Sequence, residues 1–363
     1  MGGTRTIRIV VLGDEGVGKS SLVMSLLTES FPDSASLPSV IPEVAIPSKY
    51  NPDNVDVFIA DTPSTVDTLG ERPVDAVVLV YDVQSENGFR RLQSHWLPWL
   101  AAQSCNVPVI LAGNKIDMRG EDMSNARLEE QIMPLMAEHR CVETCIECSA
   151  KQMINVSEVF YFAQKAVLHP SGPLYDPQEN VVKDACLSAL QRIFRHCDLD
   201  GNGFLDDSEL DSFQRRCFRQ PLQKTDIQGV KETIMEGFPE GVTPLGITEA
   251  GFVHLNKMFI QRGRLETTWA ILRAFGYNDQ LKVDLPQVDL SGESTMELTN
   301  YGVDKLKQLF YRFSKGEDDI SPGQLNDLFR LSTDGTNPWL PHFPKSAFLS
   351  ENGIYLTALL IYV

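Results

Sequence analysis

The sequence predicts an α/β domain built on a doubly wound, mostly parallel sheet, followed by an all-α region. Apolar runs of strand length alternate with helical segments over the first 168 residues, as they do in sheets of this kind. Residues 76–82 are nearly all apolar, which is typical of a parallel strand buried on both faces. After residue 181 strand signals nearly vanish while helical periodicity persists. With 363 residues, the chain has room for two or three domains.

In the first part, each predicted strand is a short apolar run, and the helices between them carry apolar residues at helical spacing. The clearest helix is 89–102, in which Leu92, Trp96, Trp99 and Leu100 fall on one face. The predicted strands are 6–12, 55–60, 76–82, 107–112 and 142–148, and the predicted helices are 21–28, 89–102, 128–139 and 156–167.

A cluster of proline and glycine at 169–173 marks the end of the first domain, because these residues interrupt both strands and helices. We expect the first domain at 1–168, a linker at 169–180, one helical unit at 181–280 and a second at 281–363. A polar connector is expected at 286–298. The predicted helices are 181–197, 208–217, 229–236, 250–260, 266–275, 301–313 and 324–331.

The chain is acidic, with a formal net charge of −17 at pH 7. It has no basic stripe that could neutralise phosphates, so we expect no binding to nucleic acid or to anionic membrane surfaces. Seven cysteines, an odd number, and the lack of a signal peptide indicate a reducing compartment. Cys141, Cys145 and Cys148 could suggest zinc, but no fourth ligand follows at the right spacing, and small thiols packed in a buried strand are the favoured interpretation.

No run of about 18 apolar residues occurs, so no transmembrane helix is expected in this chain. The C-terminal run 354–363 is apolar but only about half that length. We expect it to form a helix that packs against the domain. Because the chain ends inside this run, we expect the second helical unit to be truncated.

Residues 13–20 read GDEGVGKS, a complete G-x-x-x-x-G-K-[ST] phosphate loop. The loop lies between a predicted strand and a predicted helix, the context in which backbone N–H groups point at phosphates. Lys19 is expected to bridge the β- and γ-phosphates of a nucleoside triphosphate. The Ser20 hydroxyl should ligate Mg²⁺, and Asp61 should hold the ion through water. The residues predicted to bind the phosphates are Gly13, Glu15, Gly16, Val17, Gly18, Lys19, Ser20 and Ser21.

Two further motifs indicate that the base is guanine. Asn114, Lys115 and Asp117 form an Asn-Lys-x-Asp motif after the predicted strand 107–112. The Asp117 carboxylate could accept the N1 and N2 hydrogens of guanine, a pattern that adenine does not offer. The motif Ser149-Ala150-Lys151 follows the next strand and should bring a backbone N–H near guanine O6. Small Ras-like GTPases carry this set, and residues 5–168 resemble them throughout.

The residues expected to support hydrolysis depart from the Ras-like pattern. That family has Asp-x-x-Gly followed by a glutamine that orients water, whereas residues 61–65 read DTPST. Ser64 and Thr65 therefore replace the glycine and the glutamine. Glu15 stands where a small residue is usual, and no clear Mg²⁺-binding threonine occurs in the first switch segment, 30–47. We expect GTP hydrolysis to be slow or dependent on a partner.

A calcium-binding EF-hand loop is predicted at 198–209 (DLDGNGFLDDSE). Such a loop needs oxygen ligands at positions 1, 3, 5, 7, 9 and 12, and glycine at position 6. Here Gly203 is the turn, and apolar helices flank the loop. The predicted Ca²⁺ ligands are Asp198, Asp200, Asn202, Phe204 through its carbonyl, Asp206 and Glu209.

A second hand is expected around the turn 315–320, between the predicted helices 301–313 and 324–331. Its loop is too short, and Gln324 replaces the bidentate glutamate, so we interpret it as degenerate. Residues 245–252 and 352–359 could be ligand-free partner loops, each adding one short strand beside a neighbouring hand.

This layout of a Ras-like domain, a linker and two EF-hand units resembles Miro, the mitochondrial Rho GTPase family. The resemblance covers most of the chain and implies a protein of the outer mitochondrial membrane, facing the cytosol, that links mitochondria to motor adaptors and quality-control proteins. That family continues into a second GTPase domain and a C-terminal membrane helix. The stretches that carry the resemblance are 147–151 (ECSAK), 161–170 (YFAQKAVLHP), 172–175 (GPLY), 259–264 (FIQRGR) and 266–269 (ETTW).

Three functions from different classes remain open at this stage. The first is an adaptor switched by GTP (GDP after hydrolysis) and modulated by Ca²⁺. The second is a calcium-binding scaffold with a static, non-hydrolysing guanine nucleotide site, which Glu15, Ser64 and Thr65 favour. The third, a metabolic phosphate-loop kinase, is disfavoured because such enzymes lack the Asn-Lys-x-Asp motif.

Overall fold

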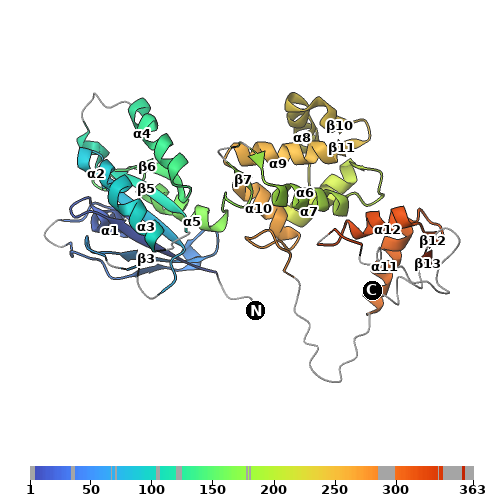
Figure 1. The fold of residues 1–363 in the computed structure, drawn as a ribbon, viewed down its shortest axis with the longest axis horizontal. Coiled ribbons are helices and arrows are strands. Elements are labelled where there is room, and N and C mark those ends of the chain that lie inside the picture. Colours follow the sequence, from blue (N-terminus) through green and yellow to red (C-terminus); the bar gives the residue numbers. More distant parts are fainter. Residues whose placement is uncertain are drawn as a thin grey trace, which may run out of the picture. The chain divides into compact units, whose positions relative to one another are not determined.

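The computed structural model describes residues 5–33, 37–66, 68–69, 72–103, 107–119, 125–176, 179, 181–284, 299–333, 335–337 and 354–355. For residues 86, 125–131 and 354–355 only the backbone is described. The chain divides into two compact units, Met1–Ser171 and Gly172–Val363, drawn in Figure 1. The predicted polar connector 286–298 lies outside the described residues.

A six-stranded sheet forms the centre of the first unit (Figure 1). Its order is β2-β3-β1-β4-β5-β6, and neighbouring strands are parallel except for β2 and β3. The predicted doubly wound, mostly parallel sheet is therefore confirmed. The strands are β1 (Thr6–Gly13), β2 (Val44–Ile46), β3 (Asp56–Asp61), β4 (Ala76–Asp82), β5 (Val109–Asn114) and β6 (Val142–Glu147).

Strand β2 was not predicted from the sequence. It has three residues, none of them fully buried, and it pairs with β3 at the edge of the sheet. A short, half-exposed edge strand carries too few alternating positions to be distinguished from a loop.

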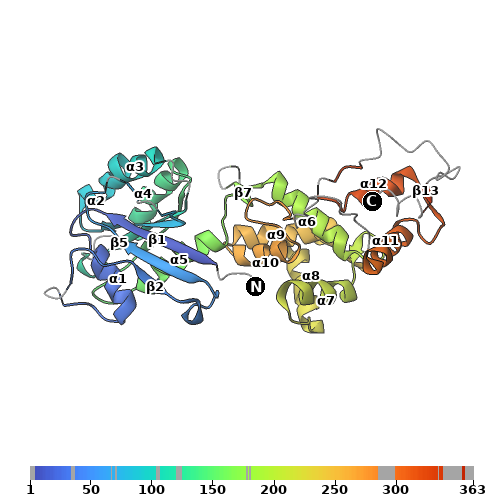
Figure 2. The same cartoon turned by 90° about the horizontal axis from the view of Figure 1, so that it is seen from below.

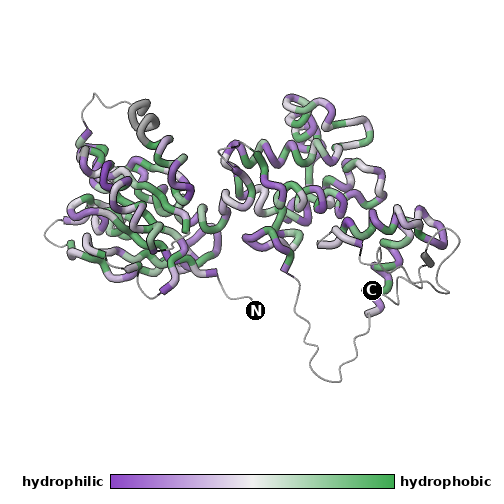
Figure 3. The backbone as a smooth tube through the Cα atoms, in the orientation of Figure 1, coloured by the Kyte–Doolittle hydropathy of each residue, from purple (hydrophilic) through white to green (hydrophobic). Residues whose placement is uncertain are grey.

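Helices cover both faces of the sheet and bury two apolar clusters (Figure 2). Leu22, Val159 and Phe160 of α1 and α5 pack on one face, and Trp96 and Leu135 of the opposite layer pack on the other. Figure 3 shows the central strands as a hydrophobic interior. The helical segments are α1 (Lys19–Thr28), η1 (Ser48–Tyr50), α2 (Glu86–Arg91), η2 (Leu92–Trp96), α3 (Leu97–Ala102), η3 (Ile116–Met118), α4 (Asn125–Glu138) and α5 (Val156–Leu168).

The predicted helix 89–102 is continuous in space, but its middle turn, η2, is a π-helix. Its closing bond runs from the Leu97 N–H to the Leu92 carbonyl, an i→i+5 bond. Pro98 follows at the start of α3. Proline has no N–H and its ring clashes with the carbonyl four residues earlier, so the ladder of i→i+4 bonds is interrupted where the wider turn lies.

The second unit begins within the predicted linker. Leu174 is fully buried in the core of this unit, and β7 (Tyr175–Asp176) pairs with β8 (Val181–Val182). The prediction of a helix from residue 181 is thus wrong at its start, because two β-branched valines form a strand. Helix α6 (Asp184–Cys197) starts only after Lys183, whose backbone is extended.

Five helices and three short strands form the larger part of this unit. The strands β10 (Val242–Thr243) and β11 (Gly246–Thr248) pair with each other, and β11 pairs with β9 (Phe204–Leu205). Trp269 is completely buried in the apolar core. The helical segments are α6 (Asp184–Cys197), α7 (Asp207–Phe218), α8 (Lys224–Gly237), η4 (Pro239–Gly241), α9 (Glu249–Gln261) and α10 (Leu265–Ala274).

The C-terminal part contains α11 (Asn300–Phe313), β12 (Asp319–Ile320), α12 (Pro322–Phe329) and β13 (Ile354–Tyr355). Strand β13 is antiparallel to β12. The predicted helix 354–363 is therefore wrong at its first two residues, whereas the alternative of a partner loop that adds a short strand is confirmed there. Residues 356–363 lie outside the described part of the chain. None of the helices in the described part is long and apolar enough to span a bilayer.

Candidate nucleotide and calcium sites

The phosphate loop uses backbone conformations that favour glycine. The φ angles of Gly13, Gly16 and Gly18 are 144°, 73° and 95°, in the region that other residues rarely adopt. A Cβ at Gly13 would lie 2.2 Å from the carbonyl oxygen of Val80, so the loop starts in direct contact with β4. Gly18 is the N-cap of α1, and the N–H groups at a helix N-terminus are suited to phosphate. Of the remaining predicted loop residues, Val17 is buried, Ser21 is half-buried and Glu15 is exposed.

Lys19 is held over the phosphate loop. Its Nζ donates to the carbonyl oxygens of Gly13 at 2.8 Å and Asp14 at 2.9 Å. Burial lowers the pKa of Lys19, and the nearby carboxylates of Asp61, Asp14 and Glu15 oppose that shift. The ammonium group is thus a buried positive charge at the N-terminus of α1.

The two residues predicted to hold Mg²⁺ are in contact. The Ser20 hydroxyl donates to Asp61 Oδ2 at 2.6 Å. The same Oδ2 atom accepts the Ile41 N–H at 2.9 Å, and Oδ1 accepts the Thr62 N–H at 2.9 Å. A hydroxyl and a carboxylate at this separation fit the oxygen donors that Mg²⁺ prefers. Asp61 also connects α1 with the first switch segment, 30–47, to which Ile41 belongs.

Asn114 connects the phosphate loop with the loop after β6. Its side chain is 2 % exposed. Nδ2 donates to the Val17 carbonyl at 2.9 Å, and Oδ1 accepts the Ala150 N–H at 3.1 Å. One backbone N–H of the motif that the sequence places near guanine O6, that of Ala150, therefore has a partner within the chain. Through this one side chain, the loop after β5 contacts both the phosphate loop and the loop after β6.

The remaining residues of the two guanine motifs lie around Asn114. The Ser149 hydroxyl donates to Asp117 Oδ1 at 2.6 Å. Lys115 adopts a left-handed conformation with φ 70°, and its Nζ lies 2.8 Å from Asp82 Oδ2. Lys151 is exposed. The carboxylate of Asp117 and the backbone of Ala150 thus lie at one edge of the sheet, at the carboxyl ends of β5 and β6, where ligands of such sheets bind.

The predicted calcium loop brings three of its carboxylates together. Oxygen atoms of Asp198, Asp200 and Glu209 all lie within 4.8 Å of one another. Asp198 and Glu209 are 6 % and 5 % exposed, and burial raises the pKa of both. Clustered, buried carboxylates repel one another, and a divalent cation would relieve that repulsion. Oxygen donors of this kind fit Ca²⁺.

The other predicted ligands have additional partners. Asp206 Oδ1 accepts the N–H groups of Ser208 at 2.8 Å and Glu209 at 2.9 Å, so it caps α7 in a capping box. Asn202 Oδ1 accepts the Phe204 N–H at 2.8 Å. Position 9 of such loops often acts through water, which is compatible with the capping role of Asp206.

Strand β11 of the partner hand lies directly on the calcium loop. Leu205 pairs with Ile247, and Leu205 is completely buried. A Cβ at Gly246 would lie 2.2 Å from the Leu205 carbonyl oxygen. Glycine is therefore required for the two backbones to approach this closely.

Two sequence profiles match the chain, and they correspond to its two units. The profile described as "Ras family" matches residues 8–169, and the profile described as "EF hand associated" matches residues 220–302. Among the similar curated proteins, "Mitochondrial Rho GTPase 1" of Arabidopsis thaliana is 42 % identical over 349 residues, covering 93 % of this chain and 53 % of that protein. "Mitochondrial Rho GTPase 2" of the same plant is 42 % identical over 366 residues, covering 98 % and 56 %. "Mitochondrial Rho GTPase 1" of Cryptococcus neoformans is 40 % identical over 393 residues, covering 96 % and 56 %.

This chain is a homologue of the mitochondrial Rho GTPases, the Miro family. It spans about half the length of the curated relatives that it matches. The matched profiles and the sheet order agree in placing a Ras-like domain first and an EF-hand-associated helical region second.

Among the described residues of the second hand of this Miro homologue, no comparable cluster occurs. Gln324, at the position of the bidentate glutamate, accepts the Ser321 N–H at 2.8 Å and so caps α12. Within the described part of the chain, the 198–209 loop holds the cluster of three possible metal-binding side chains. A partner strand, β13, is nevertheless present.

Cys141, Cys145 and Cys148 of the homologue were expected to pack in a buried strand and not to bind zinc. Cys148 is fully buried, and burial raises the pKa of the Cys145 and Cys148 thiols to about 12. Such thiols are poor sources of the thiolate that zinc requires. Among the described residues, no group of three metal-binding side chains includes them.

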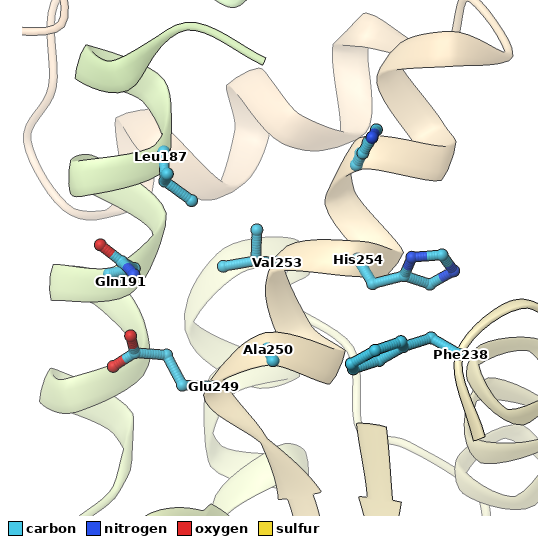
Figure 4. A pocket seen from close by; sticks show the side chains of 8 residues that line it. Leu187, Gln191, Phe238, Glu249, Ala250, Val253 and His254 are labelled. Atoms are coloured by element: carbon cyan, nitrogen blue, oxygen red, sulfur yellow. The ribbon is translucent and has the colours of Figure 1, made fainter. Parts of the chain in front are cut away.

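A surface cavity of about 340 Å³ lies between α6 and α9 (Figure 4). Leu187 of α6 and Ala250 and Val253 of α9 form its apolar wall, while Gln191 and Glu249 lie at one side. None of the residues predicted for nucleotide or calcium lines this cavity.

Proposed function

We propose that the first unit binds guanine nucleotide with Mg²⁺ and that the loop 198–209 binds Ca²⁺, so that the chain acts as a GTP- and calcium-responsive adaptor. The observation that carries the nucleotide assignment is the position of Asn114, which links Val17 of the phosphate loop to Ala150 of the guanine motif. Lys19, Ser20 and Asp61 would then face the phosphates and the ion. The ion's role would be to neutralise charge on the phosphates.

GTP hydrolysis by this chain is proposed to be slow. Thr65, which replaces the usual glutamine, is exposed, and a threonine side chain is too short to take over the reach of a glutamine. Glu15 adds a negative charge in the phosphate loop, where charge develops in the transition state. Relatives are named GTPases, which supports some turnover, either intrinsic or supplied by a partner.

The domain roles follow from these assignments. We propose a GTPase domain at 1–168, a linker at 169–180, a calcium-competent EF-hand unit at 181–280 and a degenerate one at 281–363. The names of the relatives support a mitochondrial location. The outer membrane with its cytosolic face, and motor-adaptor or quality-control partners, are proposals that come from the family resemblance.

The nucleotide proposal is tested by denaturing the purified protein and identifying the released nucleotide by ion-exchange chromatography. GDP would mean that the site hydrolyses GTP or selects GDP, and single-turnover assays would separate the two. Intact GTP would support binding without turnover. If neither guanine nucleotide is released and none binds on addition, the proposal is wrong.

The calcium proposal is tested by isothermal titration of the whole chain with CaCl₂. Glu209→Gln should weaken binding at least about ten-fold, because it removes the charge of a bidentate ligand. Asp207→Asn is the matched control, since Asp207 lies in the loop at position 10, which supplies no ligand, and pairs with Lys231 at 2.6 Å. Equal loss in both variants would contradict the assigned ligand set.

A scaffold with a static nucleotide site remains the second candidate, favoured by Glu15, Ser64 and Thr65. The two candidates differ in linkage. A switch that couples the sites requires calcium affinity to differ between the GDP-bound form and a form bound to a non-hydrolysable GTP analogue. Equal calcium affinities, together with no measurable single-turnover hydrolysis, would favour the scaffold.

A further inference from the structure

Asp14, the second residue of the phosphate loop, is held from outside the loop by two side chains. Arg91 Nε lies 2.9 Å from Asp14 Oδ1 and 2.8 Å from Oδ2. The indole N–H of Trp96 donates to Asp14 Oδ1 at 3.1 Å. The backbone carbonyl of Asp14 accepts a hydrogen bond from Lys19, so both the main chain and the side chain of Asp14 are fixed.

The π-helix η2 explains how Arg91 and Trp96 reach the same carboxylate. They are five residues apart in the sequence. In an α-helix, with about 3.6 residues per turn, side chains five residues apart point about 140° away from each other. A π-turn closes by an i→i+5 bond, which brings the fifth residue back to nearly the same face. The Leu97 to Leu92 bond is of this kind.

The charges around the loop give this contact a function. The loop carries two adjacent carboxylates, Asp14 and Glu15, and it is proposed to bind a polyphosphate. An unpaired carboxylate beside phosphates repels them. Glu15 is exposed, and water can screen it. Asp14 is instead neutralised by Arg91 and fixed by the almost completely buried Trp96, and its contact with Arg91 raises the pKa of that guanidinium.

We propose that Arg91 and Trp96 neutralise the Asp14 carboxylate and hold it turned toward α2 and η2. Asp14 then acts as a positioning residue of the nucleotide site, and its effect on the bound nucleotide depends on whether its charge is neutralised. The proposal rests on the guanine nucleotide function proposed above. Removing Arg91 leaves a freed negative charge in the phosphate loop and speeds the release of GDP. Removing the charge of Asp14 at the same time restores slow release.

The test measures the dissociation rate of a fluorescent GDP analogue (mant-GDP) from the full chain in the presence of Mg²⁺. The variants are Arg91→Ala, Asp14→Asn and the double variant. Arg90→Ala is the matched control, because Arg90 is the preceding residue of α2 and makes none of the bonds to Asp14 given above. Trp96→Phe removes the indole N–H while keeping a smaller aromatic ring at this buried position.

The expected result is about ten-fold faster release from Arg91→Ala at low salt. The double variant should release GDP within about two-fold of the rate of Asp14→Asn, because neither protein carries the charge of Asp14. Trp96→Phe should show a smaller acceleration, which Asp14→Asn should also reverse. Because the cause is an unscreened charge, the effect of Arg91→Ala should shrink as the ionic strength rises. A merely structural role would be insensitive to salt.

Three results would overturn the inference. The first is GDP release from Arg91→Ala no faster than from Arg90→Ala. The second is release from the double variant as fast as from Arg91→Ala. The third is the same acceleration at low and high salt. Failure of the unaltered chain to bind mant-GDP at all would instead overturn the nucleotide function, and this inference with it.

Discussion

Arg312 of helix α11 donates a hydrogen bond to the backbone carbonyl oxygen of Asp198, the first residue of the calcium loop. It also donates to the Arg195 carbonyl at 2.7 Å. Burial lowers the pKa of Arg312, while the carboxylates of Asp198, Glu209 and Asp200 oppose that shift. The C-terminal hand thus places a half-buried positive charge beside the carboxylates of the proposed calcium loop.

Replacing Arg312 by methionine should strengthen calcium binding. Methionine fills similar space without charge, so the repulsion between the guanidinium and the incoming cation is lost. We expect about a ten-fold lower dissociation constant, or about 1.4 kcal/mol, measured by isothermal titration. Arg330→Met is the control, since Arg330 pairs with Asp327 on the surface of α12. Unchanged or weaker binding in Arg312→Met would show that the guanidinium does not oppose calcium.

His196 should make the second unit less stable in mild acid. Its Nε2 donates to the Leu331 carbonyl at 3.1 Å, and burial, followed by the charge of Arg192, lowers the pKa of His196 to about 4. Unfolded histidine titrates near about 6.5. Between these values the unfolded chain takes up a proton that the folded chain does not, so stability falls as pH drops from about 6.5 to 4.

The prediction for His196 is checked with His196→Gln, which keeps a donor for Leu331 but does not titrate. Urea unfolding of both proteins is compared at pH 7 and pH 5. The stability of the unaltered protein relative to the variant should decrease at pH 5. A constant difference between the two proteins at both pH values would mean that His196 is not the titrating group.

Gly246→Ala should disrupt the pairing between the calcium loop and its partner hand. The new Cβ would lie 2.2 Å from the Leu205 carbonyl oxygen, so β9 and β11 have to separate. Both the midpoint of thermal unfolding and the calcium affinity should fall. Gly263→Ala is the control, because Gly263 has φ 72° but nothing within 4 Å of the added Cβ. Gly263→Ala should cost only about 1 to 2 kcal/mol of backbone strain, and equal effects in both variants would rule out the clash as the cause.

Asn114→Ala should destabilise the first unit even without nucleotide. It leaves the Val17 carbonyl and the Ala150 N–H without their partner in a buried place. We expect a loss of about 2 to 4 kcal/mol in the free energy of unfolding, measured by urea denaturation of nucleotide-stripped protein. If this protein is as stable as the unaltered chain, the link between the two loops does not contribute to folding.

The sheet and the motif loops were predictable because their signals are local and repeated. The run 76–82 is apolar at nearly every position, and β4 occupies the same residues. The calcium loop follows from the spacing of its oxygen donors, and β11 and β13 were expected beside the two hands. Helix ends and the starts of units were less predictable. Leu174 and Val181 lie in a segment rich in turn residues, yet tertiary packing makes them part of a core and a strand.

Contacts between residues far apart in the sequence were not predictable. Nothing local to Arg312 indicates that it reaches a loop 114 positions earlier. Asp206 caps α7 besides occupying a ligand position of the loop, and the spacing of oxygen donors did not reveal that capping role. The partners of Asp14 were hidden because helix 89–102 was predicted with α-helical periodicity. Pro98 inside that segment was the available signal of an irregular turn.

A π-turn is geometrically an α-helix that contains one extra residue. For the segment between Arg91 and Trp96, this has a consequence for comparing relatives. A protein that lacks one residue here would show a single-position gap in an alignment and would have a regular helix. It would then present only one of the two side chains to the phosphate loop. Among relatives that keep the arginine and the tryptophan, the length of this segment would separate those with the contact from those without it.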